Sequence, residues 1–133
     1  MRVALLALAT VTGACTVQGN QCLLDKECST DEVCTRDHSC VLASSVRSVK
    51  ATWTINGADP TDANCPPGEM YISFTSNSPE DSLGFRPLPC VAGQFSVDKL
   101  PVWFDRVEVG FEGGARDFAM IDDTGMAALD LQL

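Results

Sequence analysis

Histidine is almost absent from this sequence, and short motifs of common enzyme chemistry are missing. The 133-residue chain has one histidine, His38, whereas a serine hydrolase needs a histidine beside its nucleophile. It has no Gly-x-Ser-x-Gly turn, phosphate-binding glycine loop or His-Glu-x-x-His pair. The acids Asp122 and Asp123 precede Thr124-Gly125, a turn signature, and neighbouring strand residues point to opposite faces. The sequence therefore predicts a protein that is not an enzyme, with no catalytic residue and no cofactor.

Positive charge is also scarce. Nine lysine and arginine residues stand against eighteen aspartate and glutamate residues, which gives a net charge of −9 at pH 7. A nucleic-acid-binding surface needs clustered basic side chains that displace counterions from phosphates, whereas the cations here are scattered singly among carboxylates. Nucleic acid is therefore not expected as a partner, and anionic lipid headgroups are expected to repel the body of the protein.

The N-terminal leader, residues 1–14, is apolar but short. Arg2 supplies a positive charge, residues 3–11 form an apolar run, and the small residues Gly13-Ala14 precede Cys15. A membrane-spanning helix needs about 20 apolar residues. The leader therefore has the three parts of an export signal that is removed, and not the length of a span.

The run Val11-Thr12-Gly13-Ala14-Cys15 resembles the lipobox of bacterial lipoproteins, with Thr12 at a position that is usually leucine. This resemblance implies that the leader is cut off and that Cys15 receives fatty acyl chains, which hold the protein to a lipid bilayer. Thr16, rather than aspartate, after Cys15 is similar to lipoproteins of the outer membrane, so we expect a place in the cell envelope. The alternative is ordinary cleavage after Ala14 or Ala9, which leaves Cys15 as a plain thiol or disulfide partner.

The number of cysteines is odd, which agrees with lipid on one of them. The chain has seven cysteines, and an exported protein rarely keeps a lone thiol. Lipid on Cys15, followed by a tether over residues 15–21, leaves four cysteines in residues 22–40 and a further pair, Cys65 and Cys90. We expect three disulfides.

Residues 22–40 contain Cys22, Cys28, Cys34 and Cys40, six positions apart at each step, and few apolar side chains. Disulfides must replace a hydrophobic core in such a segment. The segment resembles the small Cys-rich modules of myxobacterial-type surface lipoproteins, which are described as Dickkopf N-terminal-like, and this implies a disulfide framework only. Four cysteines allow three connectivities. We favour Cys22 with Cys34 and Cys28 with Cys40, which interlocks the two loops.

A metal site in this segment is the alternative. Structural zinc sites use closely spaced cysteine pairs, which are missing here, and an exported chain meets oxidising conditions. The acids of the segment do not follow the spacing of an EF-hand calcium loop; they are Asp25, Glu27, Asp31, Glu32 and Asp37. We therefore expect no metal, a solvated acidic face, and His38 as a surface residue.

After a linker over residues 41–47, residues 48–133 show the alternation of half-buried strands. Val49, Ala51, Trp53 and Ile55 face one way, and the strand ends at Asn56-Gly57. The same period recurs at Met70–Phe74, Phe95–Val97, Val107–Phe111, Phe118–Met120 and Leu129–Leu133, with proline and glycine breakers between the runs. About seven short strands predict a mainly β fold, a small antiparallel β-sandwich.

The order of these strands and the bridge between Cys65 and Cys90 resemble a transthyretin-like or carboxypeptidase-regulatory-like β-sandwich; an immunoglobulin-like sandwich is the alternative. The resemblance implies a noncatalytic module that stabilises, spaces or binds. Trp53 is expected in the core, and Trp103, in an apolar run that cannot all face inward, is the candidate contact residue. The expected function is a lipid-anchored interaction or structural module whose partner is an envelope protein or glycan. The alternative is a secreted glycan-binding or inhibitory protein without lipid.

Overall fold

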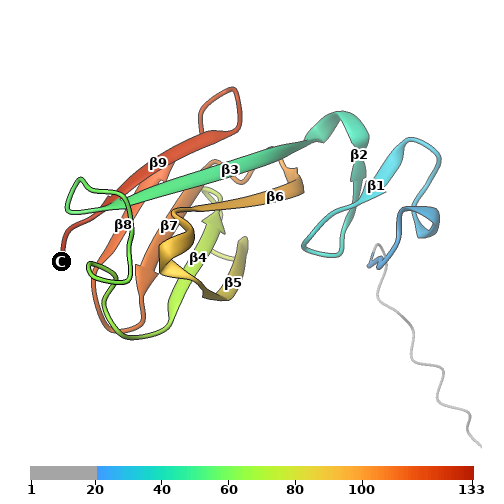
Figure 1. The fold of residues 1–133 in the computed structure, drawn as a ribbon. Coiled ribbons are helices and arrows are strands. Elements are labelled where there is room, and N and C mark those ends of the chain that lie inside the picture. Colours follow the sequence, from blue (N-terminus) through green and yellow to red (C-terminus); the bar gives the residue numbers. More distant parts are fainter. Residues whose placement is uncertain (1–20) are drawn as a thin grey trace, which may run out of the picture.

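The computed structural model describes residues 21–133, and shows a small Cys-rich hairpin beside a β-sandwich (Figure 1). The leader, Cys15 and most of the tether lie outside the described residues. Among residues 21–133, helices are single short turns, none of them long or apolar enough to cross a membrane. The C-terminus lies at the opposite end of the sandwich from the hairpin.

The Cys-rich part consists of a 3₁₀-helix, η1 (Asp25–Glu27), and two short antiparallel strands, β1 (Glu32–Cys34) and β2 (Cys40–Leu42). Disulfides join Cys22 to Cys34 and Cys28 to Cys40, with Cα–Cα distances of 5.7 and 5.5 Å. This is the interlocked pairing favoured from the sequence. The two disulfides tie the chain before and after η1 to the hairpin, so covalent bonds hold a segment that has almost no apolar core.

The stretch expected to be a linker, residues 41–47, carries regular structure instead. It contains the end of β2, a 3₁₀-helix η2 (Ala43–Ser45) and the start of β3 (Val46–Ile55). The physical reason is pairing, because Val46 lies opposite Pro101 and Arg47 opposite Leu100 on a neighbouring strand. The long strand β3 therefore runs directly out of the Cys-rich part into the sandwich (Figure 1).

The sandwich has a three-stranded sheet in the order β6-β3-β9 and a four-stranded sheet in the order β5-β4-β7-β8. The remaining strands are β4 (Met70–Thr75), β5 (Ser82–Leu88), β6 (Gln94–Pro101), β7 (Arg106–Phe111), β8 (Arg116–Met120) and β9 (Met126–Leu131). The mainly β sandwich expected from the sequence is confirmed. One pair, β3 with β9, is parallel, because the intervening strands carry the chain back to the same end of the sheet.

The core lies between the two sheets and follows the alternation seen in the sequence. Strands β3 and β4 bury every second side chain, and Trp53 is 3% exposed within this core. The indole Nε1 of Trp53 donates a hydrogen bond of 2.9 Å to the carbonyl oxygen of Cys90. Cys90 is disulfide-bonded to Cys65, so the bridge is fixed against the core through Trp53.

Strand β8 is oriented opposite to the expectation from its apolar residues. Phe118 and Met120 are 66% and 56% exposed, whereas Ala119 packs against the core. On the same inward side, the Asp117 carboxylate accepts a hydrogen bond of 2.8 Å from the Asp130 amide of β9. Small and polar side chains face inward here because β8 lies against the edge strand of the other sheet. Two large apolar side chains are consequently left on the surface.

Candidate functional site

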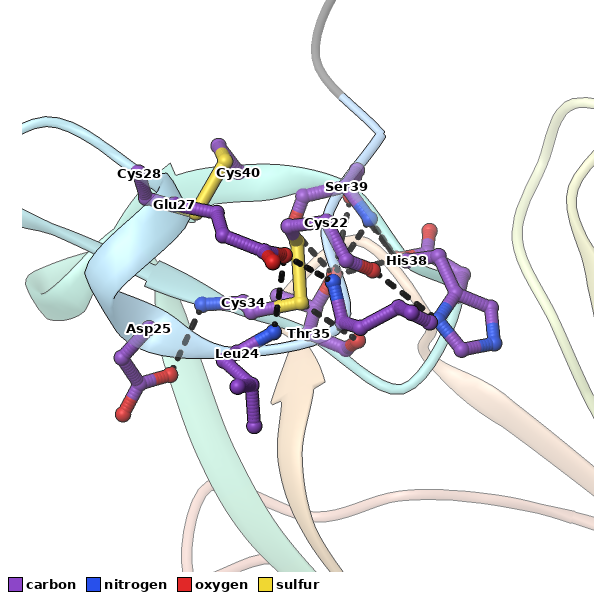
Figure 2. The surroundings of a disulfide bond; sticks show 12 residues. Cys22, Leu24, Asp25, Glu27, Cys28, Cys34, Thr35, His38, Ser39 and Cys40 are labelled. Atoms are coloured by element: carbon purple, nitrogen blue, oxygen red, sulfur yellow. Dashed lines mark hydrogen bonds between the residues drawn. A yellow bond between two sulfur atoms is a disulfide. The ribbon is translucent and has the colours of Figure 1, made fainter. Parts of the chain in front are cut away.

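The sulfur atoms of the Cys-rich part lie close together but are oxidised. Sγ atoms of Cys22, Cys28 and Cys40 all lie within 4.8 Å of one another. They belong to two disulfides (Figure 2), and metal binding by cysteine requires a thiolate. His38 is exposed, and its Nδ1 lies 3.1 Å from the carbonyl oxygen of Cys22. In this oxidised form the cluster supports a structural role for the four cysteines.

Two acidic side chains, Asp25 and Glu27, are exposed, as expected for a solvated acidic face, and they also hold backbone amides. The Oε2 atom of Glu27 accepts hydrogen bonds from the amides of Leu23 and Leu24, at 2.7 and 3.1 Å. These bonds hold the pKa of Glu27 below its ordinary value. Asp25 accepts a bond of 3.0 Å from the Cys34 amide, as Figure 2 shows. The acids therefore fix the conformation of η1.

The Cys-rich part is joined to the sandwich by two ion pairs. Strand β6 has an irregular register opposite Ser48, and Lys99 has a left-handed φ of 51°. A bulge of this kind re-aims side chains. Asp98 here pairs with the guanidinium of Arg36, and the Lys99 ammonium lies 2.7 Å from the Asp25 carboxylate. Lys99, through its hydrogen bond, is the main cause of the lowered pKa of Asp25.

Trp103, the contact residue expected from the sequence, lies in the turn between β6 and β7. Its side chain is 41% exposed beside Val102, which is 45% exposed, and its ring is stacked on buried Phe104 with centroids 6.4 Å apart. The backbone of this turn is anchored by the Val102 amide, which donates to the carbonyl of Ser45 at 2.9 Å. Trp103 is thus an exposed aromatic side chain on a well-held turn, and its role in contact stays a prediction.

A second exposed surface, not found from the sequence, covers the outer side of the four-stranded sheet. Strand register brings Arg106 opposite Met120, Glu108 opposite Phe118, and Gly110 opposite Arg116. Arg86 lies on β5, the opposite edge strand of the same sheet, at one of the exposed positions that alternate with partly buried ones. We call this surface the arginine face; it consists of Tyr71, Arg86, Arg106, Glu108, Arg116 and Phe118.

The centre of the arginine face is a bonded pair, Tyr71 and Glu108. The Tyr71 hydroxyl donates to Glu108 Oε1 at 2.7 Å. Burial, followed by the Glu108 carboxylate, raises the pKa of Tyr71 above its ordinary value. Gly110 makes room for this arrangement, since a Cβ at that position would lie 2.8 Å from Arg116 Cβ and 3.0 Å from the Tyr71 hydroxyl. The tyrosine and Arg116 therefore meet over a strand position that has no side chain.

Sequence reasoning missed the arginine face because its residues are far apart in the chain. The alternation of Arg106, Glu108 and Gly110 between buried valines was visible, but it does not say which strands lie on either side. The exposed side chains of Phe118 and Met120 were expected in the core because their alternation alone does not say which strands lie beside β8. Strand order was the missing information.

No protein-family model, curated protein or solved structure matches this chain. The resemblances to bacterial lipoproteins, to Dickkopf-like modules and to transthyretin-like sandwiches therefore stay predictions. Evidence on function comes from the fold and the surface chemistry of residues 21–133.

Proposed function

We propose that the protein is a lipoprotein of the cell envelope with two tasks: acyl chains on Cys15 anchor it, and its β-sandwich acts as a noncatalytic interaction module. The observation that supports anchoring is the pairing of the cysteines. All six described cysteines bond with one another in three disulfides, so none of them is available to Cys15. An exported chain with this arrangement uses its seventh cysteine for another purpose.

The interaction role is supported by the composition of the arginine face. Protein interfaces are enriched in arginine, aromatic residues and methionine, and depleted in lysine. The outer side of the four-stranded sheet has this composition, with three arginines, Tyr71, and the exposed side chains of Phe118 and Met120. The three described lysines, in contrast, lie elsewhere, at Lys26, Lys50 and Lys99.

The test of anchoring is metabolic labelling of the producing bacterium with palmitate, followed by separation of membrane and soluble fractions. The native chain should carry label and sediment with membranes. The Cys15→Ser variant should lose the label and move to the soluble fraction, while Asp31→Asn, an exposed substitution that keeps Cys15 and all three disulfides, should keep the label and sediment with membranes. A native chain that is exported without label would contradict the anchor and favour the secreted alternative.

A further inference from the structure

The Cys-rich part, residues 21–42, adds nothing to the core of the sandwich. The buried cluster between the two sheets, with the partly buried side chains packed against it, begins at Val49. A cleft of about 470 Å³ is lined by Leu23, Leu24 and Arg36 on the side of the Cys-rich part and by Lys99 on the side of β6. Close-packed protein interiors have few voids larger than a water molecule. Apolar packing therefore does not fix the position of the Cys-rich part on the sandwich.

The connection between the two parts, η2, is bonded at both ends but not in the middle. The Ala43 amide donates to the carbonyl oxygen of Asp31 in the Cys-rich part, and the Ser45 carbonyl oxygen accepts from the Val102 amide of the sandwich. Ser44 between them is exposed, and within residues 21–133 it makes no hydrogen bond to either part. Hinges are a few loop or element-terminal residues that absorb changes in φ and ψ. Ser44 is in the position of such a hinge.

Two ion pairs hold the Cys-rich part in place across this hinge. Within residues 21–133, every hydrogen bond between residues 21–42 and the strands of the sandwich belongs to the pair Arg36–Asp98 or the pair Asp25–Lys99. The four side chains are 36–54% exposed. An exposed pair of this kind shifts an equilibrium by no more than about fivefold, and salt screens it. The docked position therefore depends on charges that water and salt can reach.

Strand β6 departs from regular geometry where it makes both pairs. Neighbouring strand residues normally point to opposite faces, yet Asp98 and Lys99 both reach the Cys-rich part, and Lys99 has a φ of 51°. Backbone in such a rarely adopted region clusters at clamps and switch regions of proteins. An acid and a base of β6 thus face a base and an acid of the Cys-rich part. This crossed arrangement selects one docked position, because an exchange of partners would set like charges against each other.

We propose that the two ion pairs form an electrostatic latch: they hold the Cys-rich part against β6, and when they are broken the Cys-rich part turns about Ser44. The described chain enters the Cys-rich part at Gln21, six positions after Cys15. The latch therefore sets the direction in which the sandwich points away from an anchored N-terminus. This consequence rests on the anchor under "Proposed function", whereas the latch itself lies within residues 21–133 and does not depend on lipid.

The experiment measures ¹⁵N relaxation of backbone amides in the exported chain with Cys15→Ser, and compares the rotational correlation time of residues 22–42 with that of the sandwich. At low salt we expect one correlation time for both parts. Salt at about 1 M, where the Debye length is about 3 Å, should shorten the correlation time of residues 22–42 alone. Asp98→Asn with Lys99→Gln should do the same at low salt. The matched control, Asp59→Asn with Lys50→Gln, removes the same two charges elsewhere on the sandwich and should leave one correlation time.

Charge reversal separates loss of the latch from damage to the fold. Arg36→Asp alone sets a carboxylate against Asp98 and should release the Cys-rich part at low salt, whereas Arg36→Asp with Asp98→Arg restores an ion pair and should restore the common correlation time.

The proposal is overturned if both parts keep one correlation time at about 1 M salt, where exposed pairs are screened, or if they already tumble separately at low salt. It is also overturned if the matched control releases the Cys-rich part, or if charge reversal does not restore the common correlation time. Palmitate labelling of the native chain is independent of all these outcomes, so a failed anchor and a failed latch are told apart.

Discussion

The disulfide between Cys65 and Cys90 should be the largest single covalent contribution to the stability of the sandwich. We consider the double variant Cys65→Ala with Cys90→Ala. The two residues are 25 positions apart, and the chain-entropy model gives a loss of about 3.5 kcal/mol for opening a loop of this length. The bridge also fixes Cys90, whose carbonyl accepts the 2.9 Å bond from the Trp53 indole.

Urea unfolding followed by tryptophan fluorescence tests this value. The chain has two tryptophans, and Trp103→Phe removes the exposed one, so that buried Trp53 alone reports the sandwich. If the unfolding free energy falls by about 1.2 kcal/mol for each molar of urea, the loss of about 3.5 kcal/mol lowers the unfolding midpoint by about 3 M urea. The control is Cys28→Ala with Cys40→Ala, which opens the Cys-rich part and should leave the Trp53 transition near its original midpoint. A bridge variant that loses less than about 1 kcal/mol, or a control that loses as much as the bridge variant, would refute the reasoning.

Three further predictions concern the arginine face and the ion pairs. Gly110→Ala places a Cβ 3.0 Å from the Tyr71 hydroxyl, so it should lower the unfolding free energy in urea by about 1–3 kcal/mol. Tyr71 is the one tyrosine of the chain, so phenolate absorbance should report a midpoint above 10.0, and Glu108→Gln should lower it. Asp25 has a folded-state pKa below 3.8, so its contact with Lys99 stabilises the protein above that pH and is lost as pH falls through the lowered pKa. Asp25→Asn should therefore reduce the amount by which the unfolding free energy falls between neutral and acidic pH.

Matched controls separate these effects from general damage. Gly84→Ala meets its nearest atom at an ordinary 3.7 Å and should leave stability almost unchanged. If Glu108→Gln leaves the titration midpoint of Tyr71 unchanged, the 2.7 Å hydrogen bond between Tyr71 and Glu108 does not form in solution. Asp31→Asn removes one charge from the same segment, and Asp31 does not contact Lys99, which bonds to Asp25. If this variant reduces the acid-induced fall in unfolding free energy as much as Asp25→Asn does, the role of Asp25 is contradicted.

The sequence was sufficient for features that depend on local pattern. The alternation around Trp53 predicted a half-buried strand, because one sheet face meets the core and the other meets water. The Asp122 turn was visible from Thr124-Gly125, and in the structure the Asp122 carboxylate accepts bonds from the Thr124 amide and hydroxyl. Even spacing of the four N-terminal cysteines also limited their pairing to three choices.

Features that depend on strand neighbours could not be inferred from the sequence. Phe118 and Met120 have the period of core residues, and only the position of β8 beside β9 turns them outward. Residues 41–47 carry linker-like serines, yet pairing with β6 makes part of them strand. Asp98 and Lys99 have no local signal for partners more than sixty positions away, because a bulge in β6 sets their direction.

The measurement that tests the central claim most directly is the intact mass of the mature chain extracted from the membrane fraction, before and after reduction and thiol alkylation. We expect an N-terminal Cys15 that carries acyl mass, and six thiols that become alkylated only after reduction. A chain without acyl mass, or cysteines that are alkylated without reduction, would contradict this claim.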